Sequence, residues 1–273
     1  MSFPSILFLG AGQMAEALIR GVLSAGLVTS SEVMATDVRP ERLELLKSEL
    51  GIRIATDNRA ALRFGRVILV AVKPQDVAGL LAEVGPLIGP EQMLVSIAAG
   101  VTIARLEQAL SGPVPVVRVM PNTPALVGAG MAGLALGTHA SARDGELVTR
   151  LMSAVGQAVV LPEPQLDAVT ALSGSGPAFV AMFVEGLIDA GVRVGLARDV
   201  ATTLILQTVL GTAKMMQSTG RHPALMKDMV TSPGGTAIAG VHALESGGLR
   251  AALIDAIVAA TERSRALGRV DQG

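Results

Sequence analysis

The chain has 273 residues, a formal net charge of −1 at pH 7 and no cysteine. This charge balance argues against nucleic-acid and membrane-surface partners, and the lack of cysteine excludes disulfides, thiolate catalysis and cysteine-ligated metal sites. The length suits two ordinary domains. The sequence opens without the basic flank or cleavage site of a secretory signal, so we expect a cytoplasmic protein, and we expect no metal centre.

A glycine-rich turn near the start is the first candidate binding site. Ile6–Leu9 has the composition of a buried strand, and the segment after the turn has the apolar periodicity of a helix. Between them stands Gly10-Ala11-Gly12-Gln13-Met14-Ala15, a pattern that brings a dinucleotide pyrophosphate to the helix N-terminus. Asp37 ends the next predicted strand, where such folds meet the adenosine ribose.

The residues around Asp37 leave the choice between NADH and NADPH open. A carboxylate here accepts hydrogen bonds from the ribose 2′-hydroxyl and repels a 2′-phosphate, which favours NADH. Arg39 can pair with that phosphate and Thr36 can donate a hydrogen bond to it, which favours NADPH. In the alternative without a ligand, Asp37 only closes a turn before a helix that begins at Pro40.

Strands and helices alternate up to about residue 162, which predicts a parallel, doubly wound α/β sheet of Rossmann type. Ligands of such folds bind at the carboxyl edge of the sheet, where Lys73-Pro74 and Asn58 follow predicted strands. A solvated lysine and an ordinary turn are the alternatives for Lys73 and Asn58. The predicted strands are Ile6–Leu9, Glu32–Thr36, Arg66–Val72, Met93–Ala98, Val114–Val119, Met131–Leu136 and Gln157–Leu161, and the helices include Pro40–Leu50, Pro74–Val84, Thr102–Leu110 and Asp144–Val155.

Pro162-Glu163-Pro164 ends the alternation, and we expect a domain boundary there, between residues 1–162 and residues 163–273. The second part is predicted to be all helical. Its helices from Pro177 and from Arg198 are apolar around much of their circumference, which requires partners on every side. We therefore expect a homodimer, and no membrane helix, because charged residues interrupt the apolar stretch after Pro177.

Two segments rich in hydroxyls and glycine precede predicted helices in this part, the loops Ala171–Pro177 and Thr231–Thr236. Free N–H groups at a helix start, together with hydroxyls, suit a carboxylate. For Ser173 and Ser175, helix capping is an equal alternative. Two consecutive glycines cost backbone entropy that a cap does not require, so Thr231–Thr236 is interpreted as a binding loop.

Several motifs, taken in order, resemble those of pyrroline-5-carboxylate reductases, which complete proline synthesis. They are the Gly10–Ala15 turn, Ala71-Val72-Lys73-Pro74, Ser96–Thr102, Met120-Pro121-Asn122-Thr123-Pro124, Leu172–Ala178 and Thr231-Ser232-Pro233-Gly234-Gly235-Thr236. The resemblance implies NAD(P)H-dependent hydride transfer to the C=N bond of 1-pyrroline-5-carboxylate, giving L-proline. It also implies a Rossmann-type domain, an all-α dimerisation domain, and often a ring of dimers, a decamer.

The resemblance assigns roles by matching motif. Implied cofactor contacts are Gly10, Ala11, Gly12, Gln13 and Met14 at the pyrophosphate, Thr36, Asp37, Arg39 and Asn58 at the adenosine ribose, and Ala71, Val72, Lys73 and Pro74 along the channel. Implied substrate contacts are Ser232, Gly234, Gly235 and Thr236 from the partner subunit, with the Thr236 hydroxyl as the catalytic group that orients the ring nitrogen. The chain departs from the family at Asp37, where NADPH-dependent members often carry a neutral residue.

Two other functions compete with this interpretation. A β-hydroxyacid dehydrogenase also joins a Rossmann half to a helical half, but it needs a lysine on the first helix of the helical domain. No lysine lies in Ala178–Leu187. A catalytically silent dinucleotide sensor or dimeric scaffold would leave the Ser232–Thr236 loop without a task, and proline analogues would not compete for it.

Overall fold

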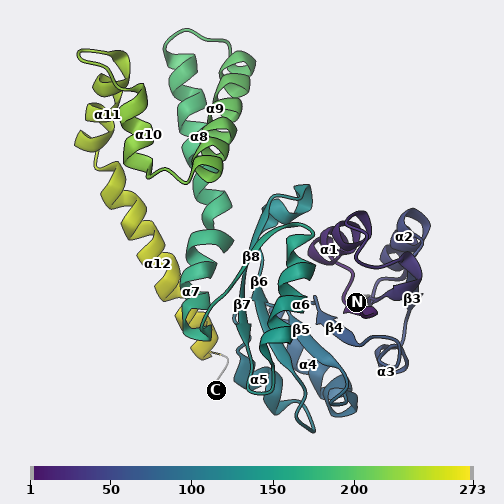
Figure 1. Ribbon diagram of the computed structural model, residues 1–273. Helices are drawn as coiled ribbons and strands as arrows, with labels where there is room; N and C mark the ends of the chain where they lie inside the picture. The colour runs from purple at the N-terminus through teal and green to yellow at the C-terminus, as the bar shows by residue number, and fades with distance from the viewer. Residues whose placement is uncertain (1–2, 271–273) are drawn as a thin grey trace. The chain divides into compact units, whose positions relative to one another are not determined.

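The computed structural model describes residues 3–270 of the chain. By its contacts the chain divides into two compact units. The first runs up to Ser175 and resumes at Ala260, and the second is Gly176–Ala259. Every strand of the described chain belongs to the first unit (Figure 1).

The first unit is built on one eight-stranded sheet of order β3-β2-β1-β4-β5-β6-β7-β8. Strands β1 to β6 are parallel, and the order reverses beside β1, where chain connections leave in opposite directions. Doubly wound folds bind dinucleotides at this switch point. The prediction of a Rossmann-type sheet followed by helices is confirmed. The strands are β1 (Ile6–Leu9), β2 (Val33–Thr36), β3 (Arg53–Ala55), β4 (Val67–Val70), β5 (Met93–Ser96), β6 (Val116–Met120), β7 (Gly130–Leu136) and β8 (Gly156–Val160).

The prediction of an all-parallel sheet is wrong for the last two strands. β7 pairs antiparallel with β6, and β8 runs parallel to β7, so both oppose the other strands. The cause is the connection between β6 and β7, which is a short segment with a 3₁₀ turn at Thr123–Val127. A parallel neighbour needs a crossover of about a dozen residues or more. Helix α6 (Ala142–Ser153) supplies such a crossover between β7 and β8.

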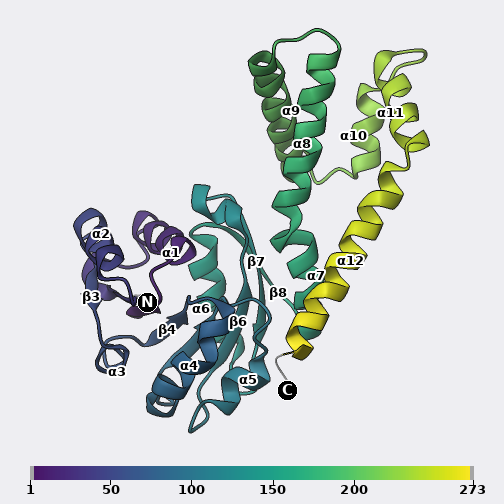
Figure 2. The same cartoon turned by 180° about the vertical axis from the view of Figure 1, so that it is seen from behind.

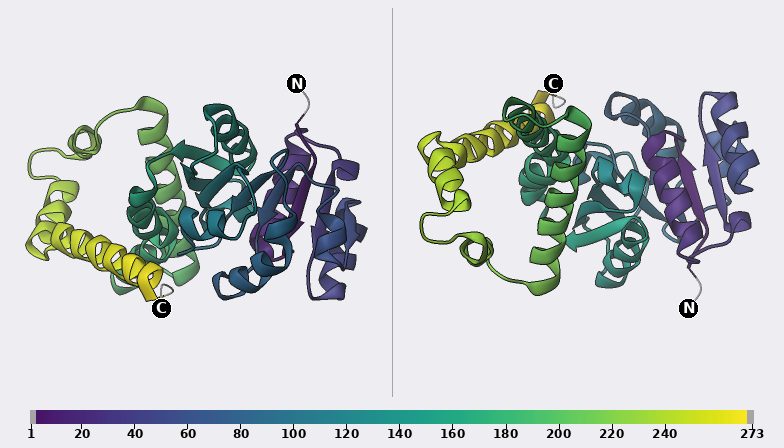
Figure 3. Two further views of the ribbon diagram at one scale, coloured as in Figure 1. Left: turned by 90° about the horizontal axis from the view of Figure 1, so that it is seen from below. Right: turned by 90° about the horizontal axis from the view of Figure 1, so that it is seen from above.

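Helices cover both faces of the sheet, because successive side chains of a strand point to opposite sides. Ile6 and Phe8 of β1 pack in one buried cluster, and Leu7 and Leu9 pack in another. Figure 1 shows α6 in front of the sheet, Figure 2 shows α4 in front, and Figure 3 shows the sheet and its helices from below and from above. The first cluster includes α1 (Gln13–Ser24), α2 (Pro40–Leu50) and α6, and the second includes α3 (Asn58–Ala61), α4 (Pro74–Val84) and α5 (Ile103–Gln108).

A buried ion pair anchors the chain where it leaves the sheet. Arg118 of β6 is 6% exposed, and its Nη1 lies 2.9 Å from Oε1 of Glu163. The backbone N–H of Ile103 donates to the same carboxylate oxygen at 2.7 Å. Glu163 therefore ties the segment after the last strand to both β6 and the start of α5.

The segment Thr170–Gly174 forms a π-helical turn, so the predicted loop at Ala171–Pro177 is wrong. The turn joins α7 (Leu166–Val169) to α8 (Gly176–Arg193). The side-chain amide of Asn122 donates to the carbonyl and to the hydroxyl of Ser173, at 3.2 Å each. These bonds satisfy the carbonyl and the hydroxyl of Ser173 in the π-helical turn. In this structure the Ser173 hydroxyl therefore accepts a hydrogen bond from Asn122.

The second unit consists of helices with little apolar surface buried inside the chain. α8 and α9 (Arg198–Thr219) lie side by side in Figures 1 and 2, followed by α10 (Pro223–Val230), α11 (Thr236–Ser246) and α12 (Leu249–Val270), which ends in the first unit. Large apolar side chains stand exposed along these helices, among them Met182, Phe183, Leu204, Leu206, Leu210, Met229, Val230 and Ile254. The helical run Glu163–Arg193 is long and apolar enough to span a membrane by composition, and only 6% of its most apolar window is buried.

Candidate functional site

A cleft of about 750 Å³ opens in the first unit at the carboxyl ends of the strands around the switch point. Its size is typical of small-molecule and cofactor sites. It combines glycine backbone, two charged residues that follow β2, and polar side chains near the starts of α3 and α4. It is lined by Gly10, Gly12, Thr36, Asp37, Val38, Arg39, Thr56, Asn58, Ala71, Val72, Lys73, Gln75, Asp76, Leu80 and Glu83.

The two glycines of the turn are required for different reasons. Gly10 has φ of +101°, and a Cβ there would lie 2.8 Å from the carbonyl carbon of Ala71, so the fold itself needs glycine. Gly12 has φ of −68°, and a Cβ there would meet no atom of residues 3–270 within 4 Å. Neither backbone conformation nor packing inside the chain requires glycine at position 12. Gly12 faces the open cleft, and the lack of a side chain there would let a ligand come close to the backbone.

This contrast makes a paired prediction. Gly10→Ala is expected to lower the free energy of unfolding by about 2 kcal/mol or more, because of the positive φ and the contact with Ala71. Gly12→Ala is expected to cost less than about 1 kcal/mol and to raise the Kd for NADH at least about tenfold, because its methyl group enters the cleft. Thermal denaturation and NADH fluorescence titration measure the two effects. Unaltered NADH affinity in Gly12→Ala would show that the pyrophosphate does not bind at this turn.

The start of α1 is prepared for an anion. Gly12 is its N-cap and provides no side-chain hydrogen bond, so first-turn N–H groups keep their capacity for a ligand. Glu16 lies in this first turn, but it is paired with Arg42 and Arg20. The hydrogen bond from Arg42, opposed by burial and assisted by Arg20, lowers the pKa of Glu16. The carboxylate of Glu16 is therefore paired and is not a free charge at the helix start.

Asp37 is held by three hydrogen bonds. Its Oδ2 accepts from the backbone N–H of Ala11 at 2.8 Å, and its Oδ1 accepts from the backbone N–H and Nε of Arg39 at 3.0 and 3.1 Å. Burial raises the pKa of Asp37, but the bonds from Arg39 and Ala11 outweigh it and leave the pKa below the usual value. The cleft therefore presents an ionised carboxylate beyond β2, with the nearest guanidinium already engaged by it.

A second uncapped helix start lies in the second unit, at Thr231–Thr236. Gly234 has φ of +67°, and Gly235 is the N-cap of α11 without a side-chain hydrogen bond. A Cβ on Gly235 would lie 2.4 Å from the hydroxyl of Ser232, so glycine lets that hydroxyl lie against the helix start. Thr236 is exposed, and none of the side-chain hydrogen bonds found within residues 3–270 uses its hydroxyl. The N–H of Gly235 donates to the carbonyl of Ser232 at 3.0 Å, so it is already used within the loop. The loop thus combines the hydroxyls of Ser232 and Thr236 with the first-turn N–H groups of α11 from Thr236 onward, at the positive end of the helix, which suits a small carboxylate.

Comparisons with known proteins agree with both parts of this arrangement. Residues 163–267 match the family model for pyrroline-5-carboxylate reductase dimerisation, and residues 5–100 match that for NADP oxidoreductases, coenzyme F420-dependent. The chain is 46% identical to pyrroline-5-carboxylate reductase of Methanosarcina acetivorans, over 96% of this chain and 97% of that one. The enzyme of Pisum sativum is 42% identical over 95% and 94%. This chain belongs to the pyrroline-5-carboxylate reductase family.

Solved structures of the family have the same fold. A pyrroline-5-carboxylate reductase from Coxiella burnetii superposes with a TM-score of 0.93 at 34% identity, covering 97% of this chain and 98% of that one. The pyrroline carboxylate reductase of Plasmodium falciparum, solved with NADP bound, gives 0.86 at 31% identity over 98% and 99%. The resemblance drawn from the motifs is therefore confirmed over nearly the whole chain.

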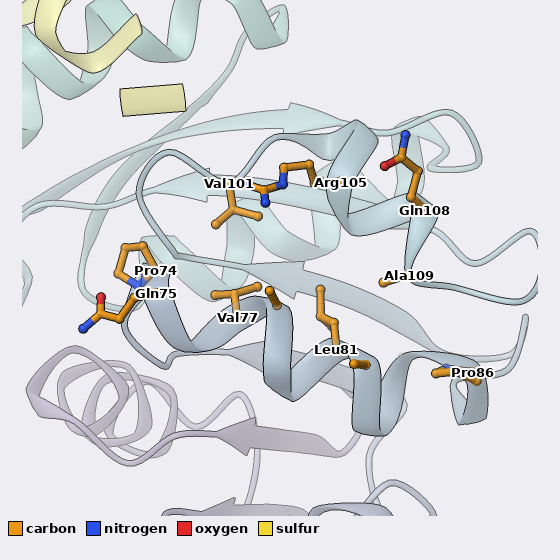
Figure 4. A pocket seen from close by; sticks show the side chains of 11 residues that line it. Pro74, Gln75, Val77, Leu81, Pro86, Val101, Arg105, Gln108 and Ala109 are labelled. Atoms are coloured by element: carbon orange, nitrogen blue, oxygen red, sulfur yellow. The ribbon is translucent and has the colours of Figure 1, made fainter. Parts of the chain in front are cut away.

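Not all residues that the motifs implied for this family line the cleft. Gly10, Gly12, Thr36, Asp37, Arg39, Asn58, Ala71, Val72 and Lys73 lie along it. Ala11 is fully buried, Gln13 is exposed at the first residue of α1, and Met14 packs against the core. Pro74 lines a neighbouring groove of about 510 Å³, where side chains of α4 and of Val101 and Arg105 face each other (Figure 4).

Several residues of the cleft were not predicted from the sequence. Asp76, Leu80 and Glu83 lie on α4, and Glu83 accepts a hydrogen bond from Asn58 at 3.5 Å. The predicted helix already began at Pro74, and helical spacing places residues 76, 80 and 83 on one face. These residues could have been identified from the sequence by two features together: their helical spacing, and the start of their helix at the carboxyl edge of the sheet.

Proposed function

We propose that this chain reduces 1-pyrroline-5-carboxylate to L-proline with NADH or NADPH, as an oxidoreductase that acts on a cyclic C=N bond. The observation that carries the proposal is the pair of sites described above. One is a cleft at the switch point with an open glycine at an uncapped helix start, and the other is a glycine and hydroxyl loop at the start of α11. Family membership over the whole chain supports combining them in one reaction.

The proposed reaction asks the protein mainly for positioning. Reduced nicotinamide supplies a hydride when it is bound, and the carbon of a protonated cyclic imine is already electrophilic. Holding two reactants together can contribute much of the rate through effective concentration. In this scheme the first-turn N–H groups of α11, beginning with that of Thr236, hold the substrate carboxylate together with the Ser232 hydroxyl. The hydroxyl of Thr236 orients the ring nitrogen, which keeps its proton when the carbon accepts the hydride.

Within the proposal, residues 163–273 form the dimerisation and substrate-binding domain. The Ser232–Thr236 loop holds the substrate next to the cofactor that is bound by the partner subunit. The match of residues 163–267 to a dimerisation model and the exposed apolar side chains of α8 and α9 support a homo-oligomer. A partner subunit would bury those side chains. We also propose a cytoplasmic location and assembly of the dimers into a ring, a decamer.

The dimer is tested by light scattering at micromolar concentration. A mass of at least twice 27.8 kDa is expected, and it should persist without detergent, because the partner surface supplies the apolar environment. A replacement within the exposed apolar set, Leu206→Glu, is expected to shift the mass toward the monomer by burying an unpaired charge at the interface. A wild-type monomer at this concentration would contradict the proposed homodimer.

The activity is tested by the loss of absorbance of NADH and of NADPH, each measured separately with 1-pyrroline-5-carboxylate. A six-membered cyclic imine carboxylate serves as the control for ring size. Turnover of the five-membered imine with formation of proline is expected. Binding of either dinucleotide without any turnover of the imine would favour a silent sensor and contradict the proposed reaction.

A further inference from the structure

Both backbone polar groups of Ala11 are held by side chains from the segment after β2. The N–H of Ala11 donates to Oδ2 of Asp37 at 2.8 Å, and its carbonyl accepts from Nε of Arg42 at 2.7 Å. Asp37 directly follows β2, and Arg42 lies in the first turn of α2. One short stretch of chain thus grips the middle residue of the glycine turn from both sides.

The turn needs such a grip because its own residues provide little stiffness. Ala11 stands between Gly10 and Gly12, and glycine populates more backbone conformations than any other residue. Arg42 makes the grip rigid, because it also forms an ion pair with Glu16 in the first turn of α1, and its side chain is only 17% exposed. Its guanidinium therefore joins three elements, the glycine turn, the helix that the turn opens, and α2.

We propose that Arg42 is a positioning residue for the dinucleotide, which holds the Gly10–Gly12 turn in the shape that receives the pyrophosphate. The inference rests on the proposed function, namely that this cleft binds a nicotinamide dinucleotide. Arg42 does not line the cleft, so it acts through Ala11. A turn ordered in advance loses less conformational entropy on binding, which increases affinity. The same geometry couples the adenosine end to the pyrophosphate end, because Asp37 serves both.

The competing explanation is that Arg42 only pairs α1 with α2 and stabilises the fold. Arg20 provides a matched control, because it also pairs with Glu16, and with Glu49, but makes no bond to the glycine turn. Arg42→Gln and Arg20→Gln each remove one positive charge and one partner of Glu16. Only Arg42→Gln releases the carbonyl of Ala11.

The experiment compares these variants with the wild type by NADH fluorescence titration at 0.05 and 0.5 M NaCl and by steady-state kinetics. Arg42→Gln is expected to raise the Kd and KM for NADH about tenfold, the effect of one charge-assisted hydrogen bond. Its kcat and its KM for the imine should stay within about twofold of wild type, as should all constants of Arg20→Gln. The ratio of mutant to wild-type Kd should be the same at both salt concentrations, because salt screens long-range attraction but not a partly buried hydrogen bond.

Three results would overturn the inference. If Arg42→Gln folds and binds NADH as Arg20→Gln does, Arg42 forms a structural ion pair only. If the binding defect of Arg42→Gln disappears at 0.5 M NaCl, the role of Arg42 is reduced to charge attraction. If Arg42→Gln does not fold, Arg42→Lys decides instead: one ammonium cannot reproduce the fork on Ala11 and Glu16, so wild-type affinity in that variant would overturn the inference. A wild-type protein that binds neither NADH nor NADPH would refute the proposed function itself.

Discussion

Replacing Thr236 with alanine is expected to lower kcat/KM for the cyclic imine on the order of a hundredfold, while the Kd for NADH stays unchanged. The hydroxyl of Thr236 is exposed, and within residues 3–270 no side-chain hydrogen bond uses it, so its loss leaves no partner unsatisfied. The fold should therefore tolerate the change. The proposed task of the hydroxyl is to orient the imine nitrogen, which affects the reaction and not dinucleotide binding.

Two variants of the same loop act as controls. Thr236→Ser keeps a hydroxyl at the helix start and should retain most of the activity. Thr231→Ala removes a hydroxyl that already bonds to the carbonyl of Asp228 at 3.1 Å, so it should change kcat/KM little. Full turnover by Thr236→Ala, measured in the same absorbance assay, would remove Thr236 from the mechanism.

Asp37→Asn is expected to raise the ratio of kcat/KM with NADPH to kcat/KM with NADH on the order of a hundredfold, starting from a wild type that favours NADH. The bonds from Arg39 and Ala11 keep the carboxylate ionised, with its pKa below the usual value. A 2′-phosphate beside it would meet a like charge, a juxtaposition that costs several kcal/mol. Asparagine has a similar shape and retains an acceptor for the N–H of Ala11, but it carries no charge.

Steady-state kinetics with both coenzymes measure this ratio, which cancels any change common to NADH and NADPH. Arg39→Gln is the companion variant. Because Arg39 is engaged by Asp37 at 3.1 Å, its replacement in the wild-type background should change the ratio less than Asp37→Asn does. A wild type that prefers NADPH, with the preference lost in Arg39→Gln, would show that Arg39 releases Asp37 to bind the phosphate.

Local sequence patterns were sufficient to predict most of the fold. Continuous apolar runs such as Ile6–Leu9 and Arg66–Val72 predicted buried strands, and a helix start at Pro40 with Gly51 after Leu50 was correctly placed. These features depend on residues close together in sequence. The antiparallel direction of β7 was not predicted, because the alternation of strands and helices suggested another parallel strand. The short connection from β6 indicates the opposite direction. The π-helical turn was missed because Ser173-Gly174-Ser175-Gly176 has the composition of a loop.

The site was predictable where function requires a special backbone and not where it depends on distant side chains. Gly10 and Gly12 stand in a recognisable order, and the structure places both on the cleft. Arg42 carries no such signal, because nothing in Pro40–Leu50 indicates that one of its arginines reaches the carbonyl of Ala11, 31 residues earlier in the chain. Likewise, the engagement of Arg39 by Asp37 is a matter of side-chain geometry that spacing alone leaves undecided.

The most direct measurement is a crystal structure of the assembled protein with a nicotinamide dinucleotide and L-proline. We expect the dinucleotide along the cleft, with its pyrophosphate at Gly12. The proline carboxylate should lie at the start of α11, on the N–H of Thr236 and the Ser232 hydroxyl, with the reacting carbon of proline about 3 to 3.5 Å from the nicotinamide ring. A structure in which no assembly of subunits brings the Ser232–Thr236 loop near the nicotinamide would contradict it.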